Sequence, residues 1–231
     1  MIPLKDDNPT SLQPRVTLSV IGLCVLVFLW QISLGPQNGQ VAVYALGFIP
    51  AVLFGIAELP DQLAWVPAPA TVITSMFLHG GLLHLGGNML YLWIFADNVE
   101  DSMGHGRFVL FYLLCGVAAA IAQAAPAMSS TIPMIGASGA VSGVLGAYVL
   151  LYPNARILVA IPLFIVLYTL RLRAVLVLGI WFAGQLLSSL AAPAMGGGVA
   201  FRAHVGGFVA GVLLIKLFSR RRLGLEFFSR R

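Results

Sequence analysis

Long apolar runs with almost no charge recur along this chain, and they restrict its fold more than any other feature. Charged residues make up only 9% of the 231 residues, and the mean hydropathy is +0.95. A soluble domain of this size needs far more charge to cover its surface. Runs of roughly 20 apolar residues are instead typical of helices that cross a membrane. The sequence therefore predicts an all-α membrane protein built as a bundle of spanning helices.

Six apolar segments have the composition of spans, and each ends at a glycine, a proline or a polar turn. The predicted spans are 16–34, 83–99, 108–125, 138–152, 174–192 and 203–218. Residues 155–172 are also apolar, but Pro162 interrupts them and Arg156 and Arg171 lie near their ends. We expect this segment to dip into the membrane without crossing it.

A long segment, residues 35–81, separates the first two predicted spans and is too irregular to cross a membrane. It contains several prolines, its only acids are Glu58 and Asp61, and it has no Lys or Arg. Its aromatic residues favour short helices in the head-group region. We therefore expect a folded, interfacial first loop, and loops of this length in compact proteins are usually functional.

The basic residues predict which side of the membrane each terminus occupies. We expect a cytoplasmic tail at 1–15, a six-span membrane domain at 16–218 and a basic cytoplasmic tail at 219–231. The segments on the cytoplasmic side, with the adjoining end of the last span, then hold every Lys and Arg except Arg202, as positive-inside bias requires. Short tails and the lack of a targeting segment favour a bacterial inner (plasma) membrane.

The net charge of +5 does not indicate a nucleic-acid partner. Its basic residues gather beside the predicted spans, where they contact anionic lipid head groups. A nucleic-acid site would need a basic face with interleaved aromatic residues, and the sequence has none. The expected partner common to all these segments is the lipid bilayer.

The chain has little that would hold a metal or a cofactor. A membrane metalloprotease using His79, His84 and His204 would require HExxH spacing with a nearby acid, whereas the segment HGGLLH has no glutamate. Cys24 and Cys115 lie inside apolar runs, where a free thiol acts as a small hydrophobic group. We expect no cofactor, no metal and no disulfide framework.

Polar residues inside membrane spans are costly and indicate function. His84 and Asn88 are four residues apart in the second predicted span, so their side chains share one helix face. Both side chains can donate hydrogen bonds and could stabilise a developing oxyanion. Hydrogen bonds between packed helices would explain the pair equally well.

Ser138 stands where a Pro/Gly-containing loop enters the fourth predicted span, in the sequence Gly136-Ala137-Ser138-Gly139. A serine at this position can be a simple helix N-cap. The same position suits a nucleophile, because the N–H groups of a helix start are unpaired and the helix dipole favours an oxyanion there. The flanking glycines leave room for a substrate backbone.

His204 begins a glycine-containing pattern in the sixth predicted span. Gly207 and Gly211 lie on its helix face, and the fourth predicted span carries a similar small-residue pattern. Such spacing lets two helices pack backbone to backbone. We expect this packing to bring His204 within hydrogen-bond reach of Ser138, as activation by a base requires. Neither span has a nearby acid, so the pair would form a dyad.

With these motifs the chain resembles the rhomboid family of intramembrane serine proteases. The similar segments lie within residues 70–218 and include HxxxN (His84, Asn88), GxSG (Gly136, Ser138, Gly139), AHxxGxxxG (203–211) and the run HGGLLHLGGNMLYLWIFADNVED. The resemblance implies cleavage of transmembrane protein substrates in or near their membrane helices. It implies that Ser138 attacks the carbonyl and that His204 is the base. The backbone N–H of Ser138, Asn88 and His84 would bind the oxyanion, and 193–202 with the fifth span would form a gate.

Two departures from the family pattern leave questions for the structure. Well-known members have a tyrosine four residues after the nucleophile that packs on the histidine, whereas this chain has Ser142. Some members have a Trp-Arg pair in the first loop, which here contains no arginine. The alternatives outside enzymes are a rhomboid-like, non-catalytic binder of transmembrane segments and a small transporter, although we find no internal repeat of the kind transporters show.

Overall fold

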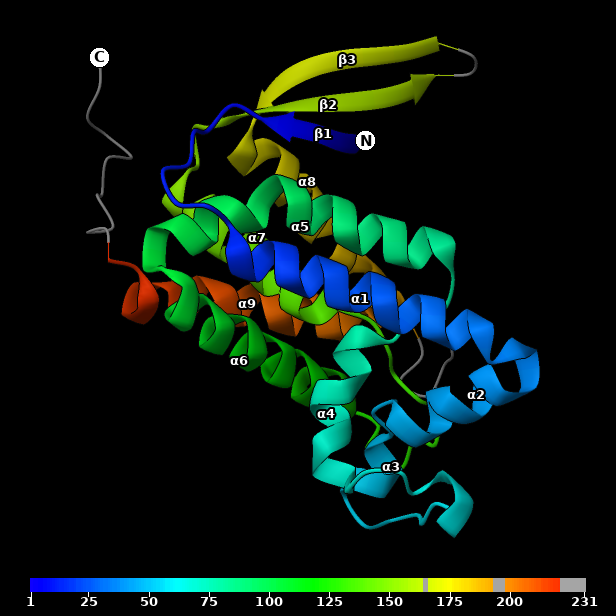
Figure 1. Ribbon diagram of the computed structural model, residues 1–231. Helices are drawn as coiled ribbons and strands as arrows, with labels where there is room; N and C mark the ends of the chain where they lie inside the picture. Colours follow the sequence, from blue (N-terminus) through cyan, green and yellow to red (C-terminus); the bar gives the residue numbers. More distant parts are fainter. Residues whose placement is uncertain (164–165, 193–197, 221–231) are drawn as a thin grey trace.

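The structure, a computed structural model, describes residues 1–163, 166–192 and 198–220 and is mostly a helical bundle (Figure 1). Each of the six predicted spans is a helix, with ends within a few residues of those predicted. These helices are α1 (Arg15–Ser33), α5 (Leu82–Met103), α6 (His105–Ala124), α7 (Ser138–Leu151), α8 (Ala174–Ala191) and α9 (Phe201–Phe218). Most of the predicted basic tail, 221–231, lies outside the described residues.

The helices differ in whether they are long enough to cross a bilayer. Among the described residues, four are long and apolar enough to do so: α1, α6, α8 and α9. Helix α5 qualifies as part of a bent pair with residues 61–77, at an angle of 81°. Helix α7 has only 14 residues, about 21 Å at 1.5 Å per residue, against a hydrocarbon core of about 30 Å. The helical membrane bundle is confirmed, and the count of six full crossings stays a prediction.

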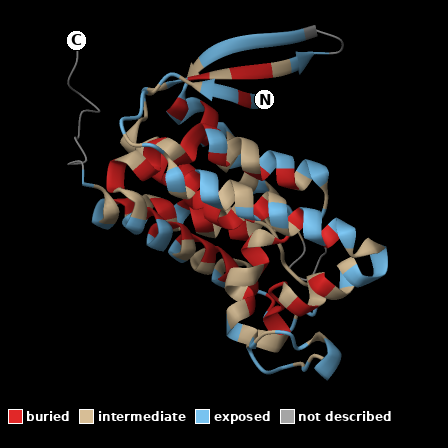
Figure 2. Ribbon diagram, viewed as in Figure 1, coloured by how far each residue is buried: buried red, intermediate tan, exposed pale blue. Residues whose placement is uncertain are grey.

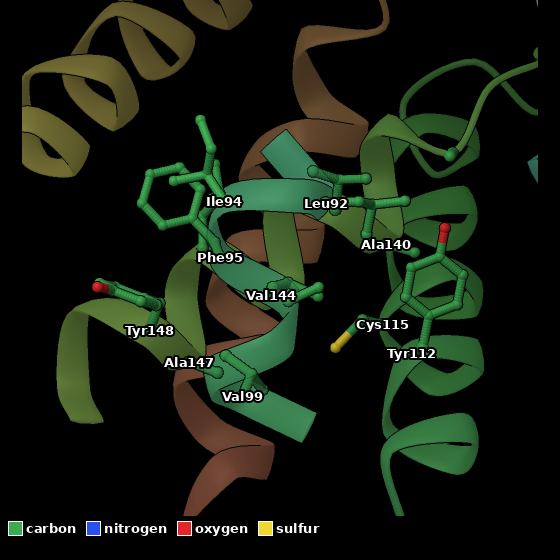
Figure 3. Packing of buried hydrophobic residues seen from close by; sticks show 14 of the residues in the cluster. Leu92, Ile94, Phe95, Val99, Tyr112, Cys115, Ala140, Val144, Ala147 and Tyr148 are labelled. Carbon is green, nitrogen blue, oxygen red and sulfur yellow. The ribbon is translucent and has the colours of Figure 1, made fainter. Parts of the chain in front are cut away.

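Helix α7 occupies the centre of the bundle, where the buried residues concentrate (Figure 2). Every residue from 139 to 148 is buried. In Figure 3, Val144 and Ala147 of α7 lie among side chains of α5 and α6, including Leu92, Val99 and Cys115. Helix α7 is therefore the enclosed central helix of the bundle, and Ser138 at its first position is half-buried.

Glycines let α7 and α9 pack with their backbones in contact. A Cβ atom added at Gly207 would collide with the carbonyl oxygen of Gly139, and one added at Gly211 would collide with that of Gly143. On α7, a Cβ at Gly146 would meet the carbonyl of Phe208. The close approach predicted from the small-residue spacing is confirmed.

The first loop is folded, as predicted, and its helices are short. They are α2 (Gly35–Leu46), α3 (Pro50–Leu53), α4 (Thr71–Thr74) and the 3₁₀ turns Asp61–Leu63, Ala68–Ala70 and Ser75–Phe77. Helix α1 ends because Gly35 takes a positive φ of 75°, which turns the chain directly into α2. The first loop also braces the segment before Ser138: Phe48 and Met134 exchange backbone hydrogen bonds of 3.0 and 2.8 Å. Its interfacial position stays a prediction.

A three-stranded antiparallel sheet is the main feature that the sequence did not indicate. Its strands are β1 (Ile2–Asp6), β2 (Arg156–Leu163) and β3 (Val166–Arg173), in the order β1-β2-β3. The segment 155–172 is thus a β-hairpin, and the N-terminal tail is folded against it beside the bundle (Figure 1). The sequence predicted a connection that dips into the membrane and did not indicate strands, because the hairpin tip is apolar on both faces and this hides the alternation by which strands are recognised.

Polar contacts tie the N-terminal segment to the bundle. The carboxylate of Glu100 is fully buried and accepts hydrogen bonds from the backbone N–H groups of Val16 and Thr17, at 3.0 and 2.8 Å. It also contacts Nδ1 of His105 at 2.5 Å. A carboxylate at this position satisfies N–H groups of the first turn of α1 and complements the helix dipole. Near the sheet, the hydroxyl of Tyr148 donates to Asp6 at 2.6 Å.

Candidate active site

Ser138 is the first residue of the central helix α7 and is half-buried. Gly136, two residues earlier, has a φ of 120° and donates its N–H to the carbonyl of Ser75 at 2.9 Å. This bond and the turn at Gly136 fix how the loop enters the helix. Helix α7 has no side-chain cap, so its first-turn N–H groups have no partner of that kind and remain available to an anion.

His204 lies in the first turn of α9, three residues before the glycine that contacts Gly139. Since Gly139 follows Ser138 directly, the glycine contact places the two catalytic candidates on adjoining turns of touching helices. The ring of His204 makes one hydrogen bond among the described residues, from Nδ1 to Oε1 of Gln185 at 2.6 Å. Its Nε2 is not part of that bond.

His84 and Asn88 lie on the facing side of α5. The backbone N–H of Gly80 donates to Nδ1 of His84 at 3.3 Å, so in the neutral ring the proton is on Nε2. That nitrogen lies next to Gly136, where an added Cβ would approach it to 2.7 Å. Asn88 uses Nδ2 to donate to the carbonyl of His84 at 3.0 Å, and an amide nitrogen has a second proton to donate.

One cavity of about 640 Å³ brings the four predicted residues together. Its walls come from α5, α7, α8, α9 and the loop before Ser138. The lining residues with polar side chains that matter here are His84, Asn88, Ser138, Ser142, Trp181 and His204. The cavity thus combines a hydroxyl, an imidazole and two further donors, which is the set that acyl transfer requires.

Sequence reasoning missed the partners of His204, both of which are on α8. Beside Gln185, the Trp181 ring lies 6.1 Å from the His204 ring, measured between centroids. Ser142 does not take the place of the tyrosine: its hydroxyl donates to the carbonyl of Ser138 at 2.6 Å. A glutamine within a largely apolar span was a signal that Gln185 has a role, although the sequence did not indicate its partner.

His79 has a structural role in the fold. Its Nδ1 contacts the carbonyl of Phe77 at 3.2 Å, and its backbone N–H donates to Gln31 of α1 at 3.0 Å. The ring lies edge-on to His84 with 5.2 Å between centroids. His79 therefore braces the start of α5 and does not line the cavity.

Comparison with known proteins assigns a family to this arrangement. Residues 68–221, more than half of the chain, match the Rhomboid domain. The chain belongs to the rhomboid family. The match covers every helix that lines the cavity, and the family resemblance drawn from the motifs is confirmed.

Curated relatives come from distant organisms. The chain is 32% identical to Rhomboid protein 1, mitochondrial, of Saccharomyces cerevisiae over 198 residues, 77% of this chain and 52% of the yeast protein. It is 36% identical to Rhomboid protease GluP of Bacillus subtilis over 138 residues, 58% of this chain and 24% of that protein. It is 30% identical to the human presenilin-associated rhomboid-like protein, mitochondrial, over 96 residues, 40% and 25% of the two chains. The chain thus spans about half the length of the yeast relative and about a quarter of the length of the other two.

Family membership indicates a general class of activity and a membrane location. Rhomboid proteins include intramembrane serine proteases, and some family members are pseudoproteases. The Bacillus relative is named a rhomboid protease. The relatives support an integral membrane protein with several spans. They include mitochondrial as well as bacterial proteins, so the expected bacterial inner membrane stays a prediction.

Proposed function

We propose that this rhomboid chain is a serine endopeptidase that cleaves transmembrane helices of membrane-protein substrates with a Ser138–His204 dyad. One observation carries the proposal: the nucleophile, the base and two candidate oxyanion donors line a single cavity at the start of the short central helix. A pseudoprotease that only binds helices would not need all four groups.

The first half of the reaction acylates Ser138. Its Oγ attacks the carbonyl carbon of the scissile peptide bond while Nε2 of His204 accepts the hydroxyl proton. The resulting oxyanion accepts hydrogen bonds from the backbone N–H of Ser138 and the free amide proton of Asn88, with Nε2–H of His84 as a third donor. Collapse of this intermediate breaks the C–N bond, and His204 returns the proton to the leaving amine.

The second half hydrolyses the acyl-enzyme. Water entering the cavity attacks the ester carbonyl, His204 takes a proton from that water, and Ser138 leaves with a proton from His204. The short α7 supports a site of this kind because its first residue lies inside the bundle while the cavity admits polar groups. Hydrolysis therefore takes place below the membrane surface, within reach of a substrate helix.

The test compares cleavage of a reporter transmembrane segment by the purified protein with cleavage by Ser138→Ala and His204→Ala. We expect both variants to lose cleavage and to keep their thermal stability. A fluorophosphonate probe should label the wild-type protein at Ser138 alone. Asn88→Ala should lower kcat by about 10²- to 10³-fold, the usual effect of removing one oxyanion donor.

Two outcomes would overturn the proposal. Undiminished cleavage by Ser138→Ala would show that another nucleophile acts. Binding of the reporter without cleavage by the wild-type protein would favour the non-catalytic binder. A chelator is included in one arm, since loss of activity there would indicate a metal-dependent reaction.

A further inference from the structure

The ring of His204 is held by α8, not by the helix that carries the nucleophile. Gln185 and Trp181 are one turn apart on α8 and so project from the same face. Oε1 of Gln185 lies 2.6 Å from Nδ1 of His204, and the Trp181 ring packs near the imidazole at an interplanar angle of 34°. From α9 itself, the Phe201 ring lies 6.5 Å from the His204 ring between centroids, at an interplanar angle of 89°.

This hydrogen bond selects the form of the ring that a base requires. An amide oxygen can only accept a hydrogen bond, so Nδ1 of His204 must carry the proton. The lone pair of the neutral ring is then on Nε2, the nitrogen available to Ser138. A carboxylate performs the same task in a catalytic triad, by fixing the tautomer and the orientation of the imidazole. The amide does so without bringing a charge into the membrane, where an unpaired charge is costly.

We propose that Gln185 is the positioning residue of His204, with Trp181 as the packing surface for the ring. Gln185 is not among the residues that line the cavity, whereas Trp181 is. Gln185 therefore acts on the reaction through His204 and not through the substrate. The inference rests on the proposed dyad, and it supplies what orients the histidine in a chain with Ser142 at the expected tyrosine position.

Helix α8, which carries Gln185 and Trp181, has few buried residues. Of the 18 residues of α8, only Ala174, Val177, Leu178 and Ser189 are buried, and three of these lie near its start. In α7, by contrast, ten consecutive residues are buried. The orientation of the base thus depends on a helix that is far less enclosed than the helix of the nucleophile. A displacement of α8 that separates Gln185 from His204 would remove the hydrogen bond that orients the imidazole, while Ser138 stays in place.

The experiment measures kcat, KM and the pH profile of cleavage for Gln185→Leu and Gln185→Glu. In Gln185→Leu we expect kcat to fall by about 10- to 100-fold, comparable to the loss of an outer partner of a functional histidine, with KM within about twofold of wild type. In Gln185→Glu, which keeps the acceptor, we expect most of the activity to return. Its acidic limb should move to higher pH, because a carboxylate beside Nδ1 stabilises the imidazolium. The other titratable side chains lining the cavity, His84 and Tyr91, are unchanged in both variants.

The matched control is Gln123→Leu. Gln123 also bonds to α9, where its Oε1 accepts from the backbone N–H of Ala203 at 3.2 Å, whereas the hydrogen bond of the His204 ring among the described residues is to Gln185. A purely structural role for such amides predicts similar effects in the two leucine variants and no change in pH profile. We expect only Gln185→Leu to lower kcat selectively and only Gln185→Glu to move the acidic limb.

The possible failures are distinguishable. If Ser138→Ala is inactive while Gln185→Leu has wild-type kcat, the positioning role is wrong and the dyad stands. If Gln185→Leu loses both activity and thermal stability, the acidic limb of the pH profile of Gln185→Glu distinguishes a positioning role from a structural one. An acidic limb at the wild-type pH overturns the proposal. If Ser138→Ala retains cleavage, the proposed function itself fails.

Discussion

Helix α9 contacts α7 and α8 in opposite ways. Against α7, glycines place the two backbones in direct contact, with no side chain between them. Against α8 and the residue that caps it, the contact consists of rings and side-chain hydrogen bonds. Phe182 stacks on Phe208 at 4.3 Å between centroids, Gln185 bonds to His204, and Arg202 donates to the carbonyl of Ala192 at 2.7 Å. The first interface fixes where the backbones of Ser138 and His204 lie. In the proposed arrangement, the second fixes how the imidazole is turned.

Polar contacts reinforce the rigid part of the molecule at its other end. Glu100 ties the first turn of α1 to α5, and Tyr148 ties α7 to the sheet through Asp6. The sheet also contacts the start of α8. One face of α9 thus packs on the central helix α7, which polar contacts connect to the sheet, whereas the other face packs on the less buried helix α8. Three substitutions test this contrast.

Gly207→Ala should have the largest effect because it attacks the backbone contact. The new Cβ would overlap the carbonyl oxygen of Gly139, so α7 and α9 must separate. Overpacking of this kind costs about 1–3 kcal/mol of unfolding free energy. Moving the nucleophile by about 1 Å can lower activity by about 100-fold. Thermal unfolding in detergent and reporter cleavage measure the two effects.

Gly179→Ala on α8 is the matched control. A Cβ added there meets nothing within 4 Å beyond the adjoining residues and the backbone of its own helix, and alanine is the better helix former. We expect stability equal to or slightly above wild type and unchanged cleavage. If the two alanine variants behave alike, the contrast between the faces of α9 is wrong.

Glu100→Gln should come next in size, because it weakens the polar brace without changing the volume. A glutamine has one acceptor oxygen for the donors that the carboxylate now serves on α1, and it adds an NH₂ group that faces them. Leaving a buried donor unsatisfied costs about 1–3 kcal/mol. Chemical denaturation in mixed micelles would measure the loss.

Asp101→Asn is the control for Glu100, since the neighbouring carboxylate also accepts bonds from the N-terminal segment, from Ser11 and Leu12 at 2.8 Å each. These contacts lie nearer the surface, where solvent can replace them. We expect a smaller destabilisation than for Glu100→Gln. Equal losses would mean that burial of Glu100 does not matter.

Asp6→Asn should have the smallest effect and should appear as a change in pH dependence. Burial, with a contribution from the charge of Asp7, raises the pKa of Asp6 above its ordinary value of 3.8. At pH values between the ordinary pKa of an aspartate and the raised pKa of Asp6, the folded protein binds more protons than the unfolded chain. The free energy of unfolding therefore falls as pH rises. Asparagine removes the contribution of Asp6 to this slope and still accepts from Tyr148. The expected change in Tm across that pH window is on the order of a degree or two.

The pH experiment compares Asp6→Asn with Glu58→Gln, a substitution in the first loop. The loop variant should keep the wild-type slope. A slope that survives in Asp6→Asn would assign it to another group. A stability that rises with pH in the wild-type protein over this window would contradict the direction of the Asp6 pKa shift.

Much of the fold followed from local pattern. Long apolar runs broken by Gly, Pro and polar turns predict membrane helices because each helix satisfies its own backbone in lipid. The glycine spacing in two of those runs predicted their contact, since only small residues permit it. The hairpin 155–172 was not predicted from the local pattern. Its two strands pair with each other, and β2 also pairs with residues 2–6. A strand partner about 150 residues away cannot be recognised from the local sequence pattern.

The sequence by itself determined the membrane class, the family resemblance and the four residues of the proposed site, because spacing on a helix fixes which side chains share a face. Only the tertiary structure decided what holds the base. Gln185 is 19 residues from His204 on a different helix, and nothing in a one-dimensional pattern states which face of α8 turns toward α9. That choice depends on how the helices pack around α7, so the partner of His204 appears only when the bundle is assembled.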